Sequence, residues 1–134
     1  MTIEETSQME IDFKKLKKVT NVFEDLIPVV IQHATTKEVL LLAYTNEEAF
    51  LITKARKRVM LYSSSRNALW SKGETSGDYL NLVEMRINCE QNSLLYLVDP
   101  VKGVCHSKDS KGHTRSTCFY RKIEEDYNLK NESL

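Results

Sequence analysis

Apolar and polar side chains alternate from residue 80 to residue 90, and this period of two constrains the fold more than any other sequence feature. Such a segment predicts a half-buried β-strand, because successive side chains of a strand point to opposite faces of the sheet. One face comprises Val83, Met85, Ile87 and Cys89, and the other Leu82, Glu84, Arg86, Asn88 and Glu90. If the strand stays regular, the Cys89 thiol therefore lies on the face opposite to Asn88 and Glu90.

Other apolar runs predict further strands, since each is short and rich in Val, Ile, Leu or aromatic residues. Two of them flank a polar turn at residues 35–38 and predict a β-hairpin. The runs cover residues 26–32, 39–44, 59–63 and 93–98. The prediction is an α+β fold, a compact and mainly antiparallel β domain with one or two flanking helices.

Two segments carry helix signals. Thr45 and Glu48 match a capping box, in which each side chain bonds a free backbone amide of the first helical turn. Nearer the N-terminus, apolar residues at roughly helical spacing predict a short amphipathic helix; they are Ile11, Leu16, Val19 and Phe23. No linker or internal repeat marks a domain boundary; this helix belongs to an N-terminal extension (1–25), and residues 122–134 form a polar C-terminal tail. The tail is expected to add a short helix or to be disordered.

Composition argues against several classes of function. The 134 residues carry a formal net charge of +0, so no nucleic-acid or membrane partner is expected from bulk charge. No apolar run approaches the roughly 20 residues that span a bilayer. The acidic first residues lack the features of a signal peptide, and an odd number of cysteines argues for the reducing cytoplasm.

The three cysteines are Cys89, Cys105 and Cys118. Three thiolates suit zinc, because soft sulfur ligands bind it well and a fourth position stays open for water. Their spacing contains no CxxC pair, and unpaired thiols are also common as small apolar core residues. The spacing of the cysteines alone does not decide between a zinc site and small core residues.

Residues 64–77 form a polar segment rich in hydroxyl groups, with the only tryptophan of the chain, Trp70. Gly73 and Gly77 permit tight backbone turns, while Arg66 and Lys72 supply positive charge. Hydroxyls, exposed amides and cations together are what a phosphate-binding loop needs. The alternative is an ordinary polar loop with Trp70 in the core.

These motifs together resemble the phosphoribosyl-AMP cyclohydrolase family of histidine biosynthesis. The resemblance spans about residues 26–121 and is most specific in the run Leu-Trp-Ser-Lys-Gly-Glu-Thr-Ser-Gly at 69–77. It continues in Cys105-His106 and in Ser-Thr-Cys-Phe-Tyr-Arg at 116–121.

The resemblance implies an intertwined homodimer that holds zinc between Cys89 of one subunit and Cys105 and Cys118 of the other. It implies a small-molecule nucleotide substrate, N1-(5-phosphoribosyl)-AMP, whose adenine ring is opened by hydrolysis between N1 and C6. Zinc would activate the water, with His106 as the candidate proton carrier and His113 as a second candidate. The expected substrate-binding residues are Arg66, Trp70, Lys72, Gly73, Glu74, Thr75, Ser76 and Gly77.

The chain departs from the family pattern in two places. Asn88, Glu90 and Asn92 stand where the family places aspartates that bind magnesium, so only one carboxylate remains. We expect magnesium binding to be weak or absent, because this hard cation requires charged oxygen ligands. The segment between Cys105 and Cys118 is also longer than usual, and it is basic.

Two alternative functions remain compatible with these departures. The first is a related enzyme that acts on another purine-like nucleotide. The second is a zinc-stapled dimer that binds a nucleotide without catalysis. The intact Cys105-His106 pair and the run at residues 72–77 favour an enzyme.

Overall fold

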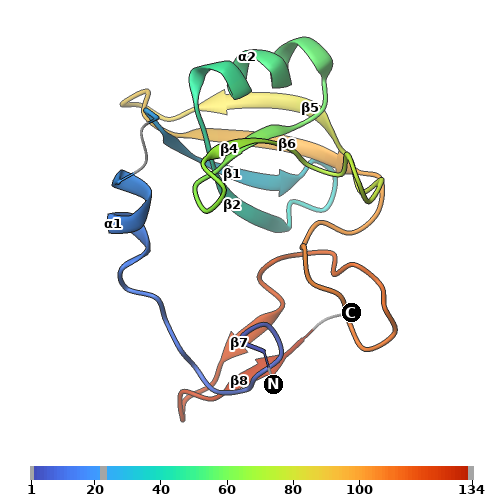
Figure 1. Ribbon diagram of the computed structural model, residues 1–134. Coiled ribbons are helices and arrows are strands. Elements are labelled where there is room, and N and C mark those ends of the chain that lie inside the picture. Colours follow the sequence, from blue (N-terminus) through green and yellow to red (C-terminus); the bar gives the residue numbers. More distant parts are fainter. Residues whose placement is uncertain (1, 22–23, 133–134) are drawn as a thin grey trace.

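The computed structural model describes residues 2–21 and 24–132, and its main element is a six-stranded sheet. The strand order is β4-β3-β2-β1-β6-β5, and every neighbouring pair is antiparallel except β1 and β6 (Figure 1). The strands are β1 (Ile27–His33), β2 (Val39–Thr45), β3 (Met60–Ser63), β4 (Ala68–Ser71), β5 (Leu80–Ile87) and β6 (Leu94–Pro100). The predicted hairpin and the mainly antiparallel sheet are therefore confirmed.

The sheet curls into a half-barrel. Arg58, just before β3, forms a bridge with Asn81 of β5, so the two sides of the sheet approach each other. Its interior is filled by alternate side chains of the central strands, including Val29, Ile31, Tyr96 and Val98, all fully buried. This core holds β1 and β6 rigid, and both strands end beside the candidate site.

Helix α2 (Glu47–Arg56) covers one face of the sheet beside β2 and β3 (Figure 1). The Thr53 hydroxyl ties it to β3, because it accepts a hydrogen bond from the Met60 amide at 2.9 Å. The N-cap is Asn46, whose side chain accepts from the Ala49 amide at 2.8 Å. The predicted capping box is wrong: Thr45 still belongs to β2 and is buried, so its side chain cannot cap the helix.

Strand β5 is less regular than its sequence predicts. A bulge between Leu82 and Glu84 shifts the register against β6, so Leu82 and Met85 both pack on the core. Val83 is left 61% exposed. The strand ends at Ile87, and residues 88–93 form a turn instead of continuing the alternation.

The two termini pack together outside the sheet. Helix α1 (Lys15–Thr20) is short, and Ile11 and Leu16 are exposed, while the predicted contribution of Phe23 lies outside the described residues. Strands β7 (Arg121–Ile123) and β8 (Leu129–Asn131) form a hairpin where a helix or a disordered tail was expected.

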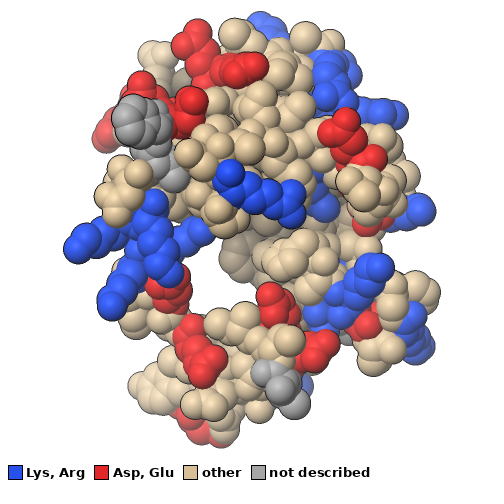
Figure 2. All heavy atoms as spheres, in the orientation of Figure 1, with Lys and Arg blue, Asp and Glu red and all other residues tan. Residues whose placement is uncertain are grey.

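Residues 2–8 lie against this hairpin, since Leu129 donates its amide to the Ser7 carbonyl at 2.6 Å. We call residues 2–8 together with β7 and β8 the terminal unit. Figure 2 shows an opening between it and the sheet. Within the described chain, neither helix is long or apolar enough to cross a membrane.

Candidate active site

The three cysteines lie at opposite ends of the sheet. Cys89 lies in the turn before β6, which we call the turn end, whereas Cys105 follows the C-terminal end of β6. Cys118 lies near Cys105, since the two side chains are hydrogen-bonded to each other. The Cys118 amide also donates to the carbonyl of Leu40 at the start of β2. We call this second region the pocket end. A seven-residue strand is about 20 Å long, so β6 separates Cys89 from the other two thiols.

Cys105 and Cys118 form a thiol–thiolate pair at the pocket end. The Cys105 side chain is 2% exposed, and its pKa is lowered to about 5 because Cys118 donates a hydrogen bond to it. The Ser107 hydroxyl, at 3.0 Å from Cys105 Sγ, also stabilises the thiolate. The pKa of Cys118 is raised by the same hydrogen bond, by burial and by the neighbouring negative charge.

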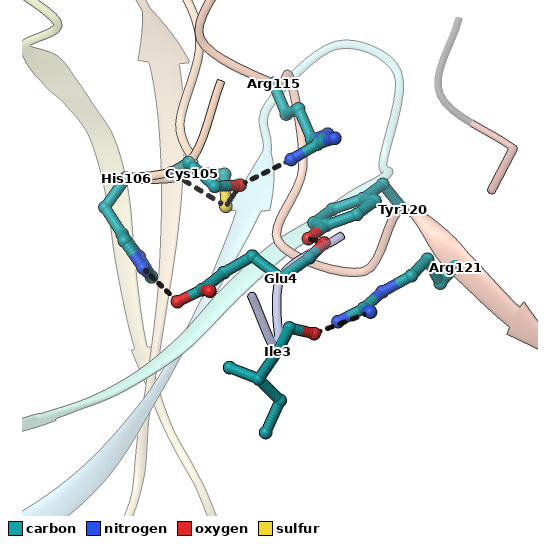
Figure 3. A network of polar contacts seen from close by, with 8 residues as sticks. Ile3, Glu4, Cys105, His106, Arg115, Tyr120 and Arg121 are labelled. Carbon is teal, nitrogen blue, oxygen red and sulfur yellow. Dashed lines mark hydrogen bonds and ion pairs between the residues drawn. The ribbon is translucent and has the colours of Figure 1, made fainter. Parts of the chain in front are cut away.

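Arg115 holds this arrangement in place. Its guanidinium donates to the Ser107 hydroxyl at 2.9 Å and stacks 4.0 Å above the Tyr120 ring (Figure 3). Its carbonyl accepts from the Cys105 amide at 3.0 Å. The chain thus supplies two preorganised soft ligands, which fit one half of a zinc site.

Cys89 cannot complete that site from within the same chain. Its side chain is exposed, and no cluster of three potential metal ligands occurs among residues 2–21 and 24–132. Two sulfur atoms bound to one zinc lie within about 4.6 Å of each other, since each Zn–S bond is about 2.3 Å long. The separation along β6 is several times larger.

A cavity of about 510 Å³ opens beside Cys105. Cys105 and His106 form one side of it, and the polar segment after β4 forms the other. Of the predicted substrate-binding residues, seven line the cavity: Arg66, Trp70, Lys72, Gly73, Glu74, Thr75 and Ser76. The structure therefore brings together two motifs that are separated in the sequence, the run at residues 69–77 and the Cys105-His106 pair.

The glycines shape this cavity in different ways. Gly73 has φ +88°, and a Cβ atom there would meet the Asp78 carbonyl carbon at 2.4 Å, so no larger residue fits. Gly77 does not line the cavity, and its amide donates to the Gly73 carbonyl at 2.7 Å. That amide closes the turn and is not available for a phosphate, contrary to the expected role of Gly77.

Lys72 is the buried cation of the cavity. It is 5% exposed, and burial lowers its pKa, while the charges of Asp78 and both pocket-end cysteines oppose that shift. Its ammonium nitrogen lies 5.8 Å from the centre of the Trp70 ring. A positive charge held here favours an anionic group in the cavity and the thiolate form of the cysteines.

His106 points from the cavity toward the terminal unit. Its Nε2 atom lies 3.7 Å from Oε1 of Glu4, and Arg121 holds the turn that contains Glu4 by donating to the Ile3 carbonyl at 2.8 Å (Figure 3). His113, the second candidate proton carrier, does not line this cavity. It faces Asp109 at 4.0 Å on the loop between the two cysteines.

The cavity also has residues outside the predicted set. Leu69, Ser71, Asp78 and Thr114 line it, and Glu4 contacts His106. Lys108 lines it as well, from the basic loop between the two cysteines. Asp78 follows the run at residues 69–77 directly, so its position was a usable signal. Glu4 carried none, because its contact depends on tertiary packing of the N-terminal segment.

Asn88, Glu90 and Asn92 do come together, although the strand ends before them. Asn88 Nδ2 donates to Asn92 Oδ1 at 2.6 Å, and Asn92 Nδ2 donates to Glu90 Oε2 at 3.3 Å. Asn88 Oδ1 also accepts from two backbone amides of the turn at 2.9 Å. Side-chain amides thus hold the turn closed through hydrogen bonds.

Comparison with known proteins agrees with the motifs. Residues 41–120 match the family described as Phosphoribosyl-AMP cyclohydrolase. A phosphoribosyl-AMP cyclohydrolase of Archaeoglobus fulgidus is 46% identical over 101 residues, covering 75% of this chain and 88% of the relative. One of Methanocella arvoryzae is 47% identical over 105 residues, covering 78% of this chain and 83% of the relative.

A longer relative also matches. The histidine biosynthesis bifunctional protein HisIE of Pasteurella multocida is 45% identical over 98 residues, which cover 73% of this chain. The match spans only 46% of that relative, so this chain corresponds to less than half of the bifunctional protein. With a family match over residues 41–120 and relatives covered across most of their length, the chain belongs to the phosphoribosyl-AMP cyclohydrolase family.

Proposed function

We propose that this protein hydrolyses N1-(5-phosphoribosyl)-AMP between N1 and C6 of the adenine ring, as a step of histidine biosynthesis. The observation that carries this proposal is the cavity in which the glycine-rich loop faces the Cys105-His106 pair. The names of the relatives support the same reaction. With free thiols in all three cysteines, we place the protein in the reducing cytoplasm.

We infer a zinc ion at the pocket end, bound by Cys105, Cys118 and Cys89 of a second copy. The lowered pKa of Cys105 supports it, because zinc binds thiolate and not thiol. The position of Cys89 beyond the far end of β6 supports a bridging site, since one chain alone cannot bring three thiols together. When bound, zinc supplies a Lewis acid that makes hydroxide available near neutral pH.

The surface of β5 supports a homodimer. This strand is last in the sheet order, and its outer edge bonds residues 57–59 only through Leu80 and Leu82, so pairing with another chain is possible along its second half. Val83 and Ile87 are 61% and 55% exposed, which is unfavourable on a free surface. A second copy that covers β5 would bury both side chains and carry Cys89 toward the partner's cavity.

The residues of the chain have distinct roles in this reaction. The oxygen of water adds to C6, the N1–C6 bond breaks, and N1 receives a proton, which leaves a carboxamide and a formimino group. His106 accepts the proton of the attacking water, and Glu4 faces its Nε2 atom. Trp70 and Lys72 line the cavity that receives the nucleotide.

Magnesium has no role in this proposal. The turn end offers one carboxylate, and its two asparagine side chains already hydrogen-bond to each other. A divalent cation would have to replace those hydrogen bonds with little charge in return.

Purified zinc-loaded protein and a strain lacking the cyclohydrolase provide the test. The protein should convert N1-(5-phosphoribosyl)-AMP to the ring-opened product, and its gene should restore growth without histidine. Binding of the nucleotide without ring opening would contradict the enzyme assignment. Hydrolysis restricted to another purine nucleotide would contradict the substrate.

A further inference from the structure

A second cavity, also of about 510 Å³, adjoins the first. The two share one wall, formed by Ser76, Asp78, Lys108 and Thr114. Lys102 and His113 contribute to the far side of the second cavity. Neither Cys105 nor His106 lines the second cavity, so the ring-opening step proposed above assigns no role to it.

A small hairpin builds the outer side of the second cavity. Lys108 pairs with Thr114, and the Asp109 amide donates to the His113 carbonyl at 2.8 Å. The Asp109 carboxylate accepts from the amides of Lys111 and His113, both at 2.9 Å. These bonds are typical of a turn closed by an Asp side chain. The hairpin therefore presents Lys108 from a preorganised backbone.

A hydrogen bond joins this hairpin to Asp78, which directly follows the run at residues 69–77. The Thr114 hydroxyl donates to Asp78 Oδ2 at 3.0 Å, across 36 residues of sequence. On the other side, Gly103 lies so close that a Cβ atom would meet the Thr114 carbonyl oxygen at 2.3 Å. Both contacts hold the shared wall between the two cavities in one position.

The charges in the second cavity suit a sugar phosphate. Asp78 is only 5% exposed, and a carboxylate has about four acceptor positions, of which the Thr114 hydroxyl takes one. Lys102 and Lys108 are exposed, and neither forms an ion pair within the described part of the chain. Buried carboxylates bind ribose hydroxyls in nucleotide-binding proteins, and free ammonium groups bind phosphate.

We propose that the second cavity binds a ribose 5-phosphate group, with Asp78 accepting the ribose hydroxyls and Lys108 and Lys102 binding the phosphate. The inference rests on the proposed function, because N1-(5-phosphoribosyl)-AMP carries two such groups on one adenine. One of them occupies this cavity while the adenine ring lies in the first. Asp78, on the shared wall, thus sets the boundary between the base and the sugar phosphate.

Ribose 5-phosphate itself is the probe. Its binding to zinc-loaded, full-length protein is measured by calorimetry for the wild type and for Lys108→Ala, Lys102→Ala and Lys111→Ala. Loss of a charged partner for phosphate should weaken binding about tenfold in the first two variants. Lys111 lies on the same hairpin but lines neither cavity, so Lys111→Ala should match the wild type within about twofold.

A second pair of measurements separates the sugar from the phosphate. Asp78→Asn should weaken ribose 5-phosphate and leave inorganic phosphate unchanged, whereas Lys108→Ala should weaken both. With N1-(5-phosphoribosyl)-AMP, Lys108→Ala should raise KM about tenfold and leave kcat nearly constant. If Asp78→Asn lowers the melting temperature strongly, the two lysine variants alone decide the question.

The outcomes keep the two proposals apart. If the wild type hydrolyses N1-(5-phosphoribosyl)-AMP but both lysine variants keep its KM, the subsite is wrong and the proposed function stands. If ribose 5-phosphate binds in a Lys108-dependent way but the nucleotide is not hydrolysed, the subsite stands and the proposed function is wrong. Equal binding in Lys108→Ala and Lys111→Ala overturns the subsite directly.

Discussion

The two ends of the sheet hold cysteines in opposite surroundings. At the pocket end, Cys105 is buried, hydrogen-bonded and held beside a second thiol by the Arg115–Ser107 contact. At the turn end, Cys89 is exposed in a short turn without another thiol nearby. The pocket end thus brings two thiols together, whereas the turn end presents one exposed thiol to the surface.

The difference lies in how each end is held together. The pocket end is organised by contacts between remote segments, such as Cys118 with Leu40 and Thr114 with Asp78. The turn end is organised by local hydrogen bonds among residues 88–93. The conformation of the turn end is therefore specified by neighbouring residues, whereas the pocket end requires the whole fold.

The prediction with the largest expected effect tests whether thiols from the two ends, in two different chains, bind one zinc ion. Cys89→Ser and Cys105→Ser should each lose zinc and reduce kcat at least about a thousandfold, since metal activation of water contributes several kcal/mol. Coexpression of the two variants should restore about a quarter of wild-type activity, because half of the randomly paired dimers contain one intact site of two. Zinc content and steady-state rates measure both effects.

Two results would contradict the shared site. Full zinc content in Cys89→Ser would show that this thiol is not a ligand. Absence of activity in the coexpressed mixture, despite heterodimers detected by mass spectrometry, would show that each site is built within one chain.

A smaller effect tests whether the pocket end carries the substrate charge. Lys72→Ala should raise KM about tenfold or more and change kcat less, if the ammonium binds the ground state and the transition state alike. Lys54→Ala is the control, because Lys54 is an exposed cation on α2 away from the cavity.

Steady-state kinetics with the nucleotide substrate distinguish the roles of Lys72. An unchanged KM would show that Lys72 does not bind the substrate. A fall in kcat alone would indicate that its charge acts on the buried thiol pair instead.

The smallest expected effect concerns magnesium at the turn end. Activity and melting temperature of the natural chain should be indifferent to millimolar magnesium. Asn88→Asp combined with Asn92→Asp removes the 2.6 Å hydrogen bond and gathers three carboxylates, which should cost about 1 kcal/mol of stability. Magnesium should restore that loss, and thermal unfolding with and without the ion measures it.

Glu90→Gln in the double variant is the matched control. It leaves two of the three carboxylates, so the magnesium response should decrease. A natural chain whose melting temperature or activity rises with magnesium would show that other carboxylates complete the site.

Local patterns determined much of what the molecule looks like. Apolar runs of five to seven residues predict β1, β2, β3 and β6, because burial of β-branched side chains is readable without tertiary information. The polar segment at residues 64–77 contributes seven predicted residues to the cavity, since its residues are adjacent in sequence. Both motifs that line the cavity were recognised in the sequence, but the sequence did not predict that they lie side by side.

Only the tertiary structure decided the remaining features. The bulge after Leu82 lies where two adjacent apolar residues, Leu82 and Val83, interrupt the alternation, but the pairing with β6 decides its form. The C-terminal hairpin packs against residues 7 and 8, and this contact joins the two ends of the chain. Asp78 and Glu4 make contacts across 36 or more residues of sequence, and Lys108 joins the same cavity lining as Asp78, which no local pattern records. Cys89 was recognisable as a ligand type from sequence, but only the length of β6 places it too far away to serve its own chain.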